Sequence, residues 1–294
     1  MRKLFKYLSK NDRKDSSGHI KDRLEFVSSA SQGATVTHTK YRVASCQSTG
    51  KERARNEDTL FILNTFLSGL ESSVAFGIYL VADGMGGHQS GELASSLAAQ
   101  AVSQYLVEHV YQEALFERRA FSRSELEQHL KQAVAEAQTL LLRRVPGGGT
   151  TLTCVMAFEE VVYLAHVGDS RLYLVGLDGS LSLKTRDHSL VKRLVDLGEI
   201  SESEAGLHPH RNVLYRALGQ SDPFEPDMEM FSLQPDEGLL ICSDGLWGVI
   251  SQQDIRRIIE RCEQLDIAAQ ELVNAANNAG GPDNISVILV KRIG

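Results

Sequence analysis

Hydrophobic positions gather in short runs between polar segments along most of the chain and follow a helical period in four longer stretches. The short runs are rich in Val, Ile, Leu, Phe and Tyr, as strands are, and lie at 41–46, 59–64, 74–81, 151–158, 161–167, 172–175, 181–184, 228–233, 239–242 and 285–290. The helical stretches lie at 92–109, 122–143, 252–262 and 267–277. Strands, two adjacent helices and further strands predict an α+β layered sandwich rather than a regularly alternating parallel sheet.

Local signals mark where some of these elements begin and turn. Ser122 stands three residues before Glu125, which is the spacing of a capping box at a helix start. Asp178-Gly179 separates two strand-like runs and predicts a hairpin turn. The polar segment 187–220 interrupts the strands, and its composition predicts a mostly helical insertion.

The first 38 residues differ from the rest in composition. Residues 1–40 carry nine Lys or Arg and four Asp or Glu, a net charge of +5, whereas the whole chain carries −7. With few apolar groups to offset the entropy of ordering, 1–38 are predicted to form a flexible basic tail, followed by one domain over 39–294. The positive charge suits a tether to an acidic partner or membrane surface, or equally a solvated tail without a partner.

The composition of the chain excludes several classes of function and favours others. A remainder with a net charge of −12 argues against nucleic acid as a partner and suits a protein that holds divalent cations. No apolar run approaches the ~20 residues that cross a bilayer, and charged residues interrupt the start of the chain where a signal peptide would need an apolar stretch. We therefore expect a cytoplasmic protein without a transmembrane segment. The four Cys are widely spaced and support neither a zinc site nor a disulfide framework.

Four acidic motifs each place an Asp where a predicted strand ends. They are Asn56-Glu57-Asp58, Asp83-Gly84-Met85-Gly86-Gly87-His88, Ser243-Asp244-Gly245 and Asp283-Asn284. Strand ends of a sandwich meet at its rim, so these carboxylates are expected to converge. Hard cations such as Mg²⁺ and Mn²⁺ prefer oxygen ligands, and a glycine lets the main chain approach an ion closely.

Two simpler interpretations compete with a metal site. Asp-Gly is a common turn signal, and Asp178-Gly179 fits that interpretation. Asp83-Gly84 does not, because a long helix comes after it instead of a second strand. The segment Gly84–Gly87 also resembles a nucleotide-binding loop, but Gln89 occupies the position of the third glycine in that fingerprint.

Taken in order along the chain, these motifs resemble those of bacterial protein phosphatase 2C-like enzymes, the PPM family of metal-dependent serine/threonine phosphatases. The resemblance covers about residues 41–292 and includes a flap at about 187–220. It rests on the segments 50–58, 83–88, Gly149-Thr150-Thr151, Gly168-Asp169-Ser170-Arg171, 187–191, 208–212, 243–245 and 283–286. It implies a four-layer αββα sandwich of two antiparallel sheets flanked by helices, with a metal site in a cleft at one end.

The resemblance also implies residue roles. Asp83 would bridge two Mn²⁺ or Mg²⁺ ions and the Gly84 carbonyl would bind one of them. Asp244 and Asp283 would bind the other ion, and Asp169 with Asp244 would bind a third, weaker ion. Glu57 and Asp58 resemble outer partners that hold metal-bound water, and Arg53 matches the phosphate-binding arginine, whose planar fork suits two phosphate oxygens.

The chain departs from relatives of the family at two positions. Ser48 stands where many relatives have Asp, which puts one hydrogen bond in doubt but no metal ligand. Met85 comes directly after the Asp-Gly pair, where animal relatives have a His that is a proposed general acid. His88 lies nearby, but we interpret it as structural and leave the general acid unassigned.

The predicted reaction is hydrolysis of phosphoserine and phosphothreonine in proteins by direct attack of a water that bridges two ions. The substrates would be phosphoproteins made by a Ser/Thr kinase. One rival is a metal-dependent hydrolase of small phosphate compounds, because the metal ligands do not reveal which alcohol is esterified to the phosphate. A second is a binding module without catalysis, which the intact Asp83, Asp244, Asp283 and Arg53 argue against. The sequence does not predict the oligomeric state.

Overall fold

The computed structural model describes residues 40–68, 73–86, 89–117, 119–220 and 224–294. The predicted tail over 1–38 lies outside these residues, as does His88. In the described part of the chain the strands form two antiparallel sheets. One sheet contains, in spatial order, β2 (Asp58–Ser68), β3 (Ser73–Met85), β5 (Leu152–Phe158), β6 (Val161–Val167) and β9 (Asp227–Ser232), with the short β4 (Gly149–Thr150) paired to the end of β3. The other contains β1 (Tyr41–Ser48), β11 (Ile285–Arg292), β10 (Gly238–Cys242), β7 (Arg171–Val175) and β8 (Leu181–Leu183).

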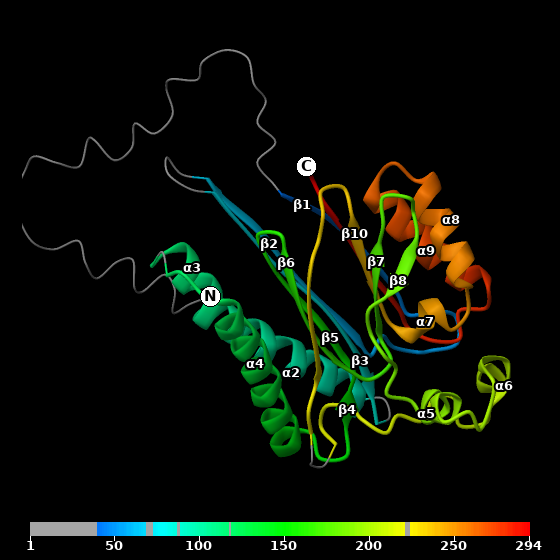
Figure 1. Cartoon of the computed structure of the whole chain (residues 1–294). Coiled ribbons are helices and arrows are strands. Elements are labelled where there is room, and N and C mark those ends of the chain that lie inside the picture. The colour runs from blue at the N-terminus through cyan, green and yellow to red at the C-terminus, as the bar shows by residue number, and fades with distance from the viewer. Residues whose placement is uncertain (1–39, 69–72, 87–88, 118, 221–223) are drawn as a thin grey trace, which may run out of the picture. The chain divides into compact units, whose positions relative to one another are not determined.

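Helices cover the outer face of each sheet, as Figure 1 shows for residues 40–294. On the β2–β9 sheet lie α2 (Gln89–Leu106) and α4 (Arg123–Arg144), and α2 continues through a π-helical turn, Val107–Tyr111, into α3 (Gln112–Leu115). On the other sheet lie α8 (Gln252–Arg261) and α9 (Leu265–Asn278), with the short α7 (Asp244–Trp247) at the end of β10. The predicted four-layer αββα sandwich of two antiparallel sheets is confirmed.

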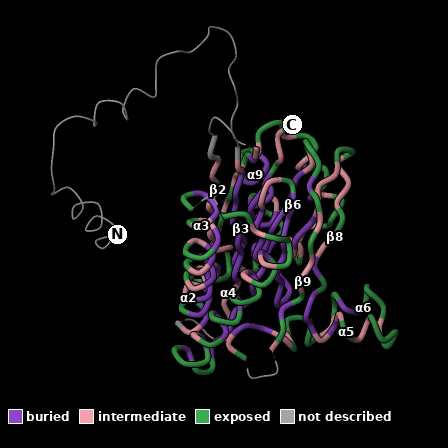
Figure 2. Tube along the Cα trace, turned by 60° about the vertical axis from the view of Figure 1, so that its left-hand side comes forward, coloured by how far each residue is buried: buried purple, intermediate pink, exposed green. Residues whose placement is uncertain are grey.

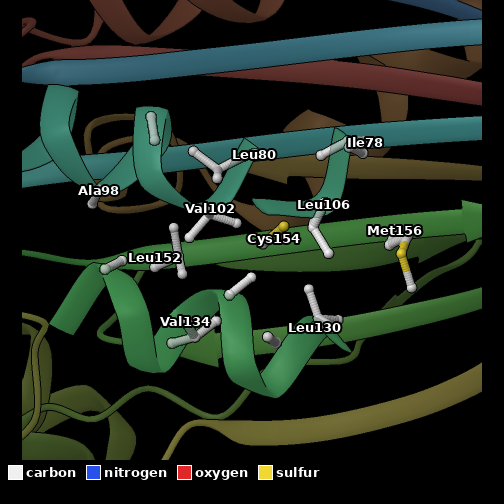
Figure 3. Packing of buried hydrophobic residues seen from close by; sticks show 14 of the residues in the cluster. Ile78, Leu80, Ala98, Val102, Leu106, Leu130, Val134, Leu152, Cys154 and Met156 are labelled. Carbon is white, nitrogen blue, oxygen red and sulfur yellow. The ribbon is translucent and has the colours of Figure 1, made fainter. Parts of the chain in front are cut away.

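Strand β3 explains how the layers are held together. Successive side chains of a strand point to opposite faces. Ile78 and Leu80 pack with α2 and α4 (Figure 3), whereas Tyr79 and Val81 pack against the second sheet. All four are fully buried. Burying each such side chain contributes about 1.5–3 kcal/mol, so both interfaces of the sheet are strongly favoured and the sheet ends are fixed in place.

Two predicted boundaries are confirmed and one prediction is wrong. The Ser122 hydroxyl caps α4 and the Glu125 carboxylate returns to the Ser122 N–H, as the capping box requires. Gly179 adopts a φ of 72° in the turn between β7 and β8. The insertion 187–220 is not mostly helical. Its helices α5 (Leu190–Asp196) and α6 (Glu202–Leu207) take up less than half of it, because turns and extended chain carry the rest.

Burial separates this insertion from the sheets. Figure 2 shows the central strands mostly buried, whereas α5 is mostly of intermediate exposure and α6 is mostly exposed. The insertion is anchored at its base, where Ser189 pairs with Leu214 and Leu218 pairs with Thr150 in isolated bridges. We call residues 187–220 the flap from here on. None of the helices in the described ranges is both long and apolar enough to cross a membrane.

Candidate metal centre and phosphate site

Two acidic residues meet at one end of the first sheet because of strand register. Asp58 begins β2 and lies directly opposite Asp83, near the end of β3. The Asp83 main chain is fixed further by two hydroxyls: its N–H donates to Thr151 Oγ1 at 2.9 Å, and its carbonyl accepts from Thr150 Oγ1 at 2.9 Å. The carboxylate of Asp83 is therefore presented from a rigid strand end.

The second sheet brings two more carboxylates to the same end. Asp244 comes after β10 and opens α7, while Asp283 stands two residues before β11, the antiparallel neighbour of β10. A Cβ on Gly245 would lie 2.0 Å from the carbonyl oxygen of Asn284, so only glycine allows the two segments to approach this closely. The strand ends of both sheets thus place acidic groups at one rim, as the sequence predicted.

Hydroxyl and amide side chains join the two sheets behind these carboxylates. Asp58 Oδ2 accepts hydrogen bonds from Ser243 Oγ at 2.8 Å and Ser286 Oγ at 2.6 Å. Asn284 Oδ1 accepts from the Glu57 N–H at 2.7 Å. No role for these Ser and Asn side chains was predicted from the sequence. The sequence feature that could have indicated this role is their position next to, or within a few residues of, the acidic residues at the strand ends.

The pKa values of the carboxyl groups record how closely they converge. Burial raises the pKa of Asp83 well above its usual value, and the nearby carboxylates of Asp58, Asp244, Asp169 and Asp283 raise it further. Burial first, and then neighbouring carboxylates, raises the pKa of Asp58 to about 6 and that of Asp244 to about 7. Several buried like charges are unfavourable without a compensating cation, so the donor set fits divalent metal ions.

Carboxylate oxygens without hydrogen-bond partners also indicate that the site fits divalent metal ions. Asp58 Oδ1 and Asp244 Oδ1 are buried and have no hydrogen-bond partner among the described residues. A buried carboxylate oxygen left unpaired is costly, and a metal ion removes that cost. A Cβ on Gly84 would come within 2.2 Å of the Gly91 carbonyl oxygen, so the main chain at Gly84 is packed as only glycine permits.

The acidic groups surround a cavity without forming a closed cage. Among the described residues, no three Asp, Glu, His or Cys side chains are grouped closely enough to enclose one ion. Each ion here would take one or two carboxylates, with water completing its shell, which is the coordination that Mg²⁺ prefers. The cavity has a volume of about 290 Å³, and the predicted site residues on its wall are Arg53, Glu57, Asp83, Gly84, Asp169, Asp244 and Asp283. Asp58 lies behind the wall.

Arg53 lies at the open side of this cavity. Its Nη2 is 2.7 Å from Asp283 Oδ2, and half of its side chain remains exposed. An arginine with free donors beside a cluster of acidic groups can turn its fork toward an anion that enters with metal ions. The structure thus brings Arg53 to the predicted place, with Asp283 as its partner.

Asp169 reaches the cavity from the turn between β6 and β7. Its carbonyl accepts a hydrogen bond from Trp247 Nε1 at 3.0 Å, and its carboxyl is buried. Burial, and then the charge of Asp244, raises its pKa well above the usual value. Trp247 therefore fixes the turn that carries Asp169.

The described part of the cavity wall offers carboxylates but no Cys, Ser or His as a nucleophile. The one hydroxyl among the described residues that line it, Thr151 Oγ1, is occupied by the Asp83 N–H and by Ser170 Oγ at 2.8 Å. Met85 lines the wall after the Asp-Gly pair. A general acid among these side chains is limited to the carboxyl groups.

Comparison with known proteins agrees with this fold and site. Residues 54–276 match the family model of protein phosphatase 2C. The serine/threonine phosphatase stp of Listeria welshimeri is 38% identical over 215 residues, which cover 73% of this chain and 84% of the relative. The chain therefore belongs to the protein phosphatase 2C family of serine/threonine phosphatases.

Solved structures show the same relationship. The serine/threonine phosphatase PstP/Ppp of Mycobacterium tuberculosis superposes with a TM-score of 0.72 at 31% identity and covers 86% of this chain and 99% of its own. A PstP catalytic domain in complex with two manganese ions gives a TM-score of 0.70 at 30% identity, with 86% and 99% coverage. The family is metal-dependent, and this chain has the fold on which a two-manganese complex is observed.

Proposed function

We propose that this chain hydrolyses phosphoserine and phosphothreonine in phosphoproteins, using two divalent ions, Mn²⁺ or Mg²⁺, held at the end of the sandwich. One observation carries the proposal: carboxylates from both sheets converge on one cavity with raised pKa values and two unpaired buried oxygens. The names of the relatives, serine/threonine phosphatases, support the substrate class.

Asp83 would help to hold both ions, because it lies among acidic residues of the adjacent strand and of the second sheet. The Gly84 carbonyl would serve one ion, and Asp244 and Asp283 the other. Glu57 and Asp58 would accept hydrogen bonds from water around the ions, and Asp169 with Asp244 would form a third, weaker ion site. When bound, the ions supply positive charge for the phosphoryl oxygens and lower the pKa of the attacking water.

Arg53 would bind and orient the phosphate group. Its exposed position at the cavity mouth lets it exchange Asp283 for two phosphate oxygens once ions occupy the carboxylates. This contact would hold the phosphorus atom in line with the nucleophile and the leaving oxygen.

Direct attack by water is the favoured chemistry, since the described cavity wall lacks Cys, Ser and His and its carboxylates would be engaged in holding ions and their water. A single displacement inverts the configuration at phosphorus, whereas a phosphoenzyme route retains it. Hydrolysis of a substrate with a chiral, isotopically labelled phosphate therefore tests this step, and retention would contradict it.

The function as a whole is tested by phosphate release from a phosphothreonine peptide with EDTA, Mg²⁺ or Mn²⁺. We expect no turnover with EDTA and restored turnover when either ion is returned in excess. Nucleotides and sugar phosphates at equal concentration serve as the comparison. Faster turnover of these small compounds would favour a small-phosphate hydrolase, and no turnover of any substrate would favour a binding module.

A further inference from the structure

The flap begins with two buried residues, Asp187 and His188, which are connected to the turn that carries Asp169, His188 directly and Asp187 through Arg171 and Trp247. Asp187 is 5% exposed and His188 is 1% exposed, although neither lies in a hydrophobic core. Burying an acidic and a basic side chain side by side is costly unless each makes specific contacts. Their contacts therefore indicate what they do.

His188 holds the residue before Asp169. The N–H of Gly168 donates to His188 Nδ1 at 3.0 Å, and the His188 N–H donates to the Gly168 carbonyl at 2.8 Å. Because Nδ1 accepts a hydrogen bond, the ring proton resides on Nε2, which lies 3.1 Å from Asp227 Oδ2. Asp227 therefore fixes the tautomer and the orientation of the ring, as carboxylates do for histidines in other sites.

Asp187 holds the opposite side of the same turn through two further residues. Its carboxylate accepts two hydrogen bonds from Arg171, at 3.0 and 2.7 Å. The Arg171 guanidinium stacks over the Trp247 ring, 3.5 Å from the ring centre, and Trp247 Nε1 donates to the Asp169 carbonyl. The Gly168-Asp169 turn is thus held on its N–H side by His188 and on its carbonyl side by the Asp187 chain of contacts.

The same two residues belong to the base of the flap. The His188 carbonyl accepts from the Tyr215 N–H at 2.9 Å, which joins the start of the flap to its returning segment. Leu190 N–H donates to the Val213 carbonyl at 2.8 Å beside it. A displacement of the flap base would therefore move the ring that holds Gly168, and with it the carboxylate of Asp169.

We propose that His188, together with Asp187, is a positioning residue that keeps the Asp169 carboxylate at the cavity and couples it to the flap. The proposal rests on the role of Asp169 given under the proposed function. It predicts that His188 affects catalysis only through Asp169. A purely structural role would instead lower stability or activity whether or not Asp169 is present.

A double-mutant cycle separates the two roles. His188→Leu should lower kcat on a phosphothreonine peptide by about 10-fold or more in the wild-type background, the size typical of residues that orient a metal ligand. In the Asp169→Ala background it should lower kcat by less than about twofold, since the residue it positions is gone. Equal losses in both backgrounds would overturn the proposal.

A matched control and a rescue variant sharpen the cycle. Gln138 is also buried and binds the other end of the flap, with Nε2 donating to the Gln220 carbonyl at 2.6 Å, but it does not contact the Asp169 turn. Gln138→Leu should have the same effect in both backgrounds.

The rescue variant His188→Asn keeps a side-chain oxygen that can accept a hydrogen bond from the Gly168 N–H, so it should restore much of the kcat that His188→Leu loses. An Asn variant as slow as the Leu variant would contradict the proposed contact.

Manganese binding gives a readout other than activity. Calorimetric titration of the His188→Leu protein should show the weakest Mn²⁺ binding event weakened or lost, with the tighter events unchanged. Uniform weakening of all events, or none, would overturn the proposal. If His188→Leu does not fold, Asp227→Ala replaces it, because the Asp227 side chain is half exposed. This variant removes the partner of His188 Nε2 and also the ion pair of Asp227 with Arg216, so Arg216→Ala is its control.

The cycle also separates this inference from the proposed function. If Asp169→Ala has normal kinetics, the role of Asp169 fails and the inference fails with it. If Asp169→Ala is slow and His188→Leu is fully additive, only the inference is overturned.

Discussion

The floor of the cavity and its rim are built by different means. The floor consists of Asp83 and Asp244, with Asp58 directly behind it, and all three are placed by strand ends whose register is fixed across both sheets. The rim consists of Arg53 and Asp169, which depend on side-chain contacts: Arg53 on Asp283, and Asp169 on Trp247 and the flap. Asp58 is buried and Asp83 and Asp244 are partly buried, whereas half of the Arg53 side chain is exposed.

This difference indicates that substitutions on the floor act mainly through charge, whereas substitutions at the rim also act through lost contacts. On the floor, the backbone fixes positions, so an amide in place of a carboxylate changes charge without changing shape. At the rim, a substitution also removes contacts that hold the neighbouring turn or anion. The floor should therefore govern whether ions bind, and the rim should govern how substrate is held and released.

The largest effect is expected from Asp83→Asn on the floor. The amide is isosteric but lacks the charge that offsets two divalent ions, so turnover with Mn²⁺ should fall by more than about a thousandfold. The circular dichroism spectrum should remain normal, since Thr150 and Thr151 hold only the main chain of residue 83. Near-normal turnover in a folded variant would remove Asp83 from the metal site.

At the rim, Arg53→Ala is expected to reduce kcat/KM for a phosphothreonine peptide by about 10- to 100-fold, the range of ~1.5–3 kcal/mol for charged hydrogen bonds. A higher KM with little change in kcat would indicate that Arg53 binds the phosphate equally well in the ground state and the transition state. A lower kcat would indicate that the contact strengthens in the transition state. Arg55→Ala is the control, because Arg55 also lines the cavity but pairs with Glu92 at 3.5 Å. Equal losses for both variants would argue against a specific role of Arg53.

Asp169→Ala tests the other part of the rim. The protein should still bind two Mn²⁺ by calorimetry, and turnover should fall by about tenfold or more. The loss should be greater for alkyl phosphoserine than for an aryl phosphate if Asp169 serves proton delivery, since an aryl leaving group needs less protonation. Identical losses on the two substrates would reject that role.

The floor also predicts how stability depends on pH in metal-free protein. The folded pKa values of Asp58 and Asp244, about 6 and 7, lie above the ordinary value of an aspartate. The folded state therefore binds more protons than the unfolded state between about pH 4 and 7, and stability falls as pH rises through that window. In the presence of EDTA, the Tm of the wild-type protein should therefore decline as pH rises over this range.

Two changes test the cause of this decline. Asp244→Asn should make the decline of Tm with pH smaller, and saturating Mn²⁺ should reverse it. A Tm that rises over this range with EDTA would show that these carboxyl groups are not buried together.

The smallest effect concerns a segment outside both regions. Removal of residues 1–38 is expected to leave hydrolysis of a small aryl phosphate unchanged within about twofold, because this segment precedes the first motif of the site. A large loss of activity would place the domain boundary earlier than residue 39. Binding of the full chain, but not the truncated one, to anionic vesicles would support the tether.

Much of this protein could be predicted from local patterns. The nearly continuous apolar run 74–81 predicted β3, and Ser122 with Glu125 predicted the start of α4, because strand composition and capping act over a few residues. The acidic motifs were visible for the same reason: each Asp comes directly after or before a strand and stands beside a glycine or another polar residue. The family resemblance then supplied roles for residues that the pattern could only mark as candidates.

Only the tertiary structure decided which of these groups meet and what holds them. Asp58 and Ser286 are 228 positions apart in the chain, yet their side chains are 2.6 Å apart, because two sheets stack with their ends in line. Two further hydrogen bonds, from Trp247 to Asp169 and from Gly168 to His188, likewise depend on where the flap returns to the sandwich. Local sequence determines strands and turns through short-range sterics. The pairing of distant side chains is set by the packing of whole layers, which no local pattern records.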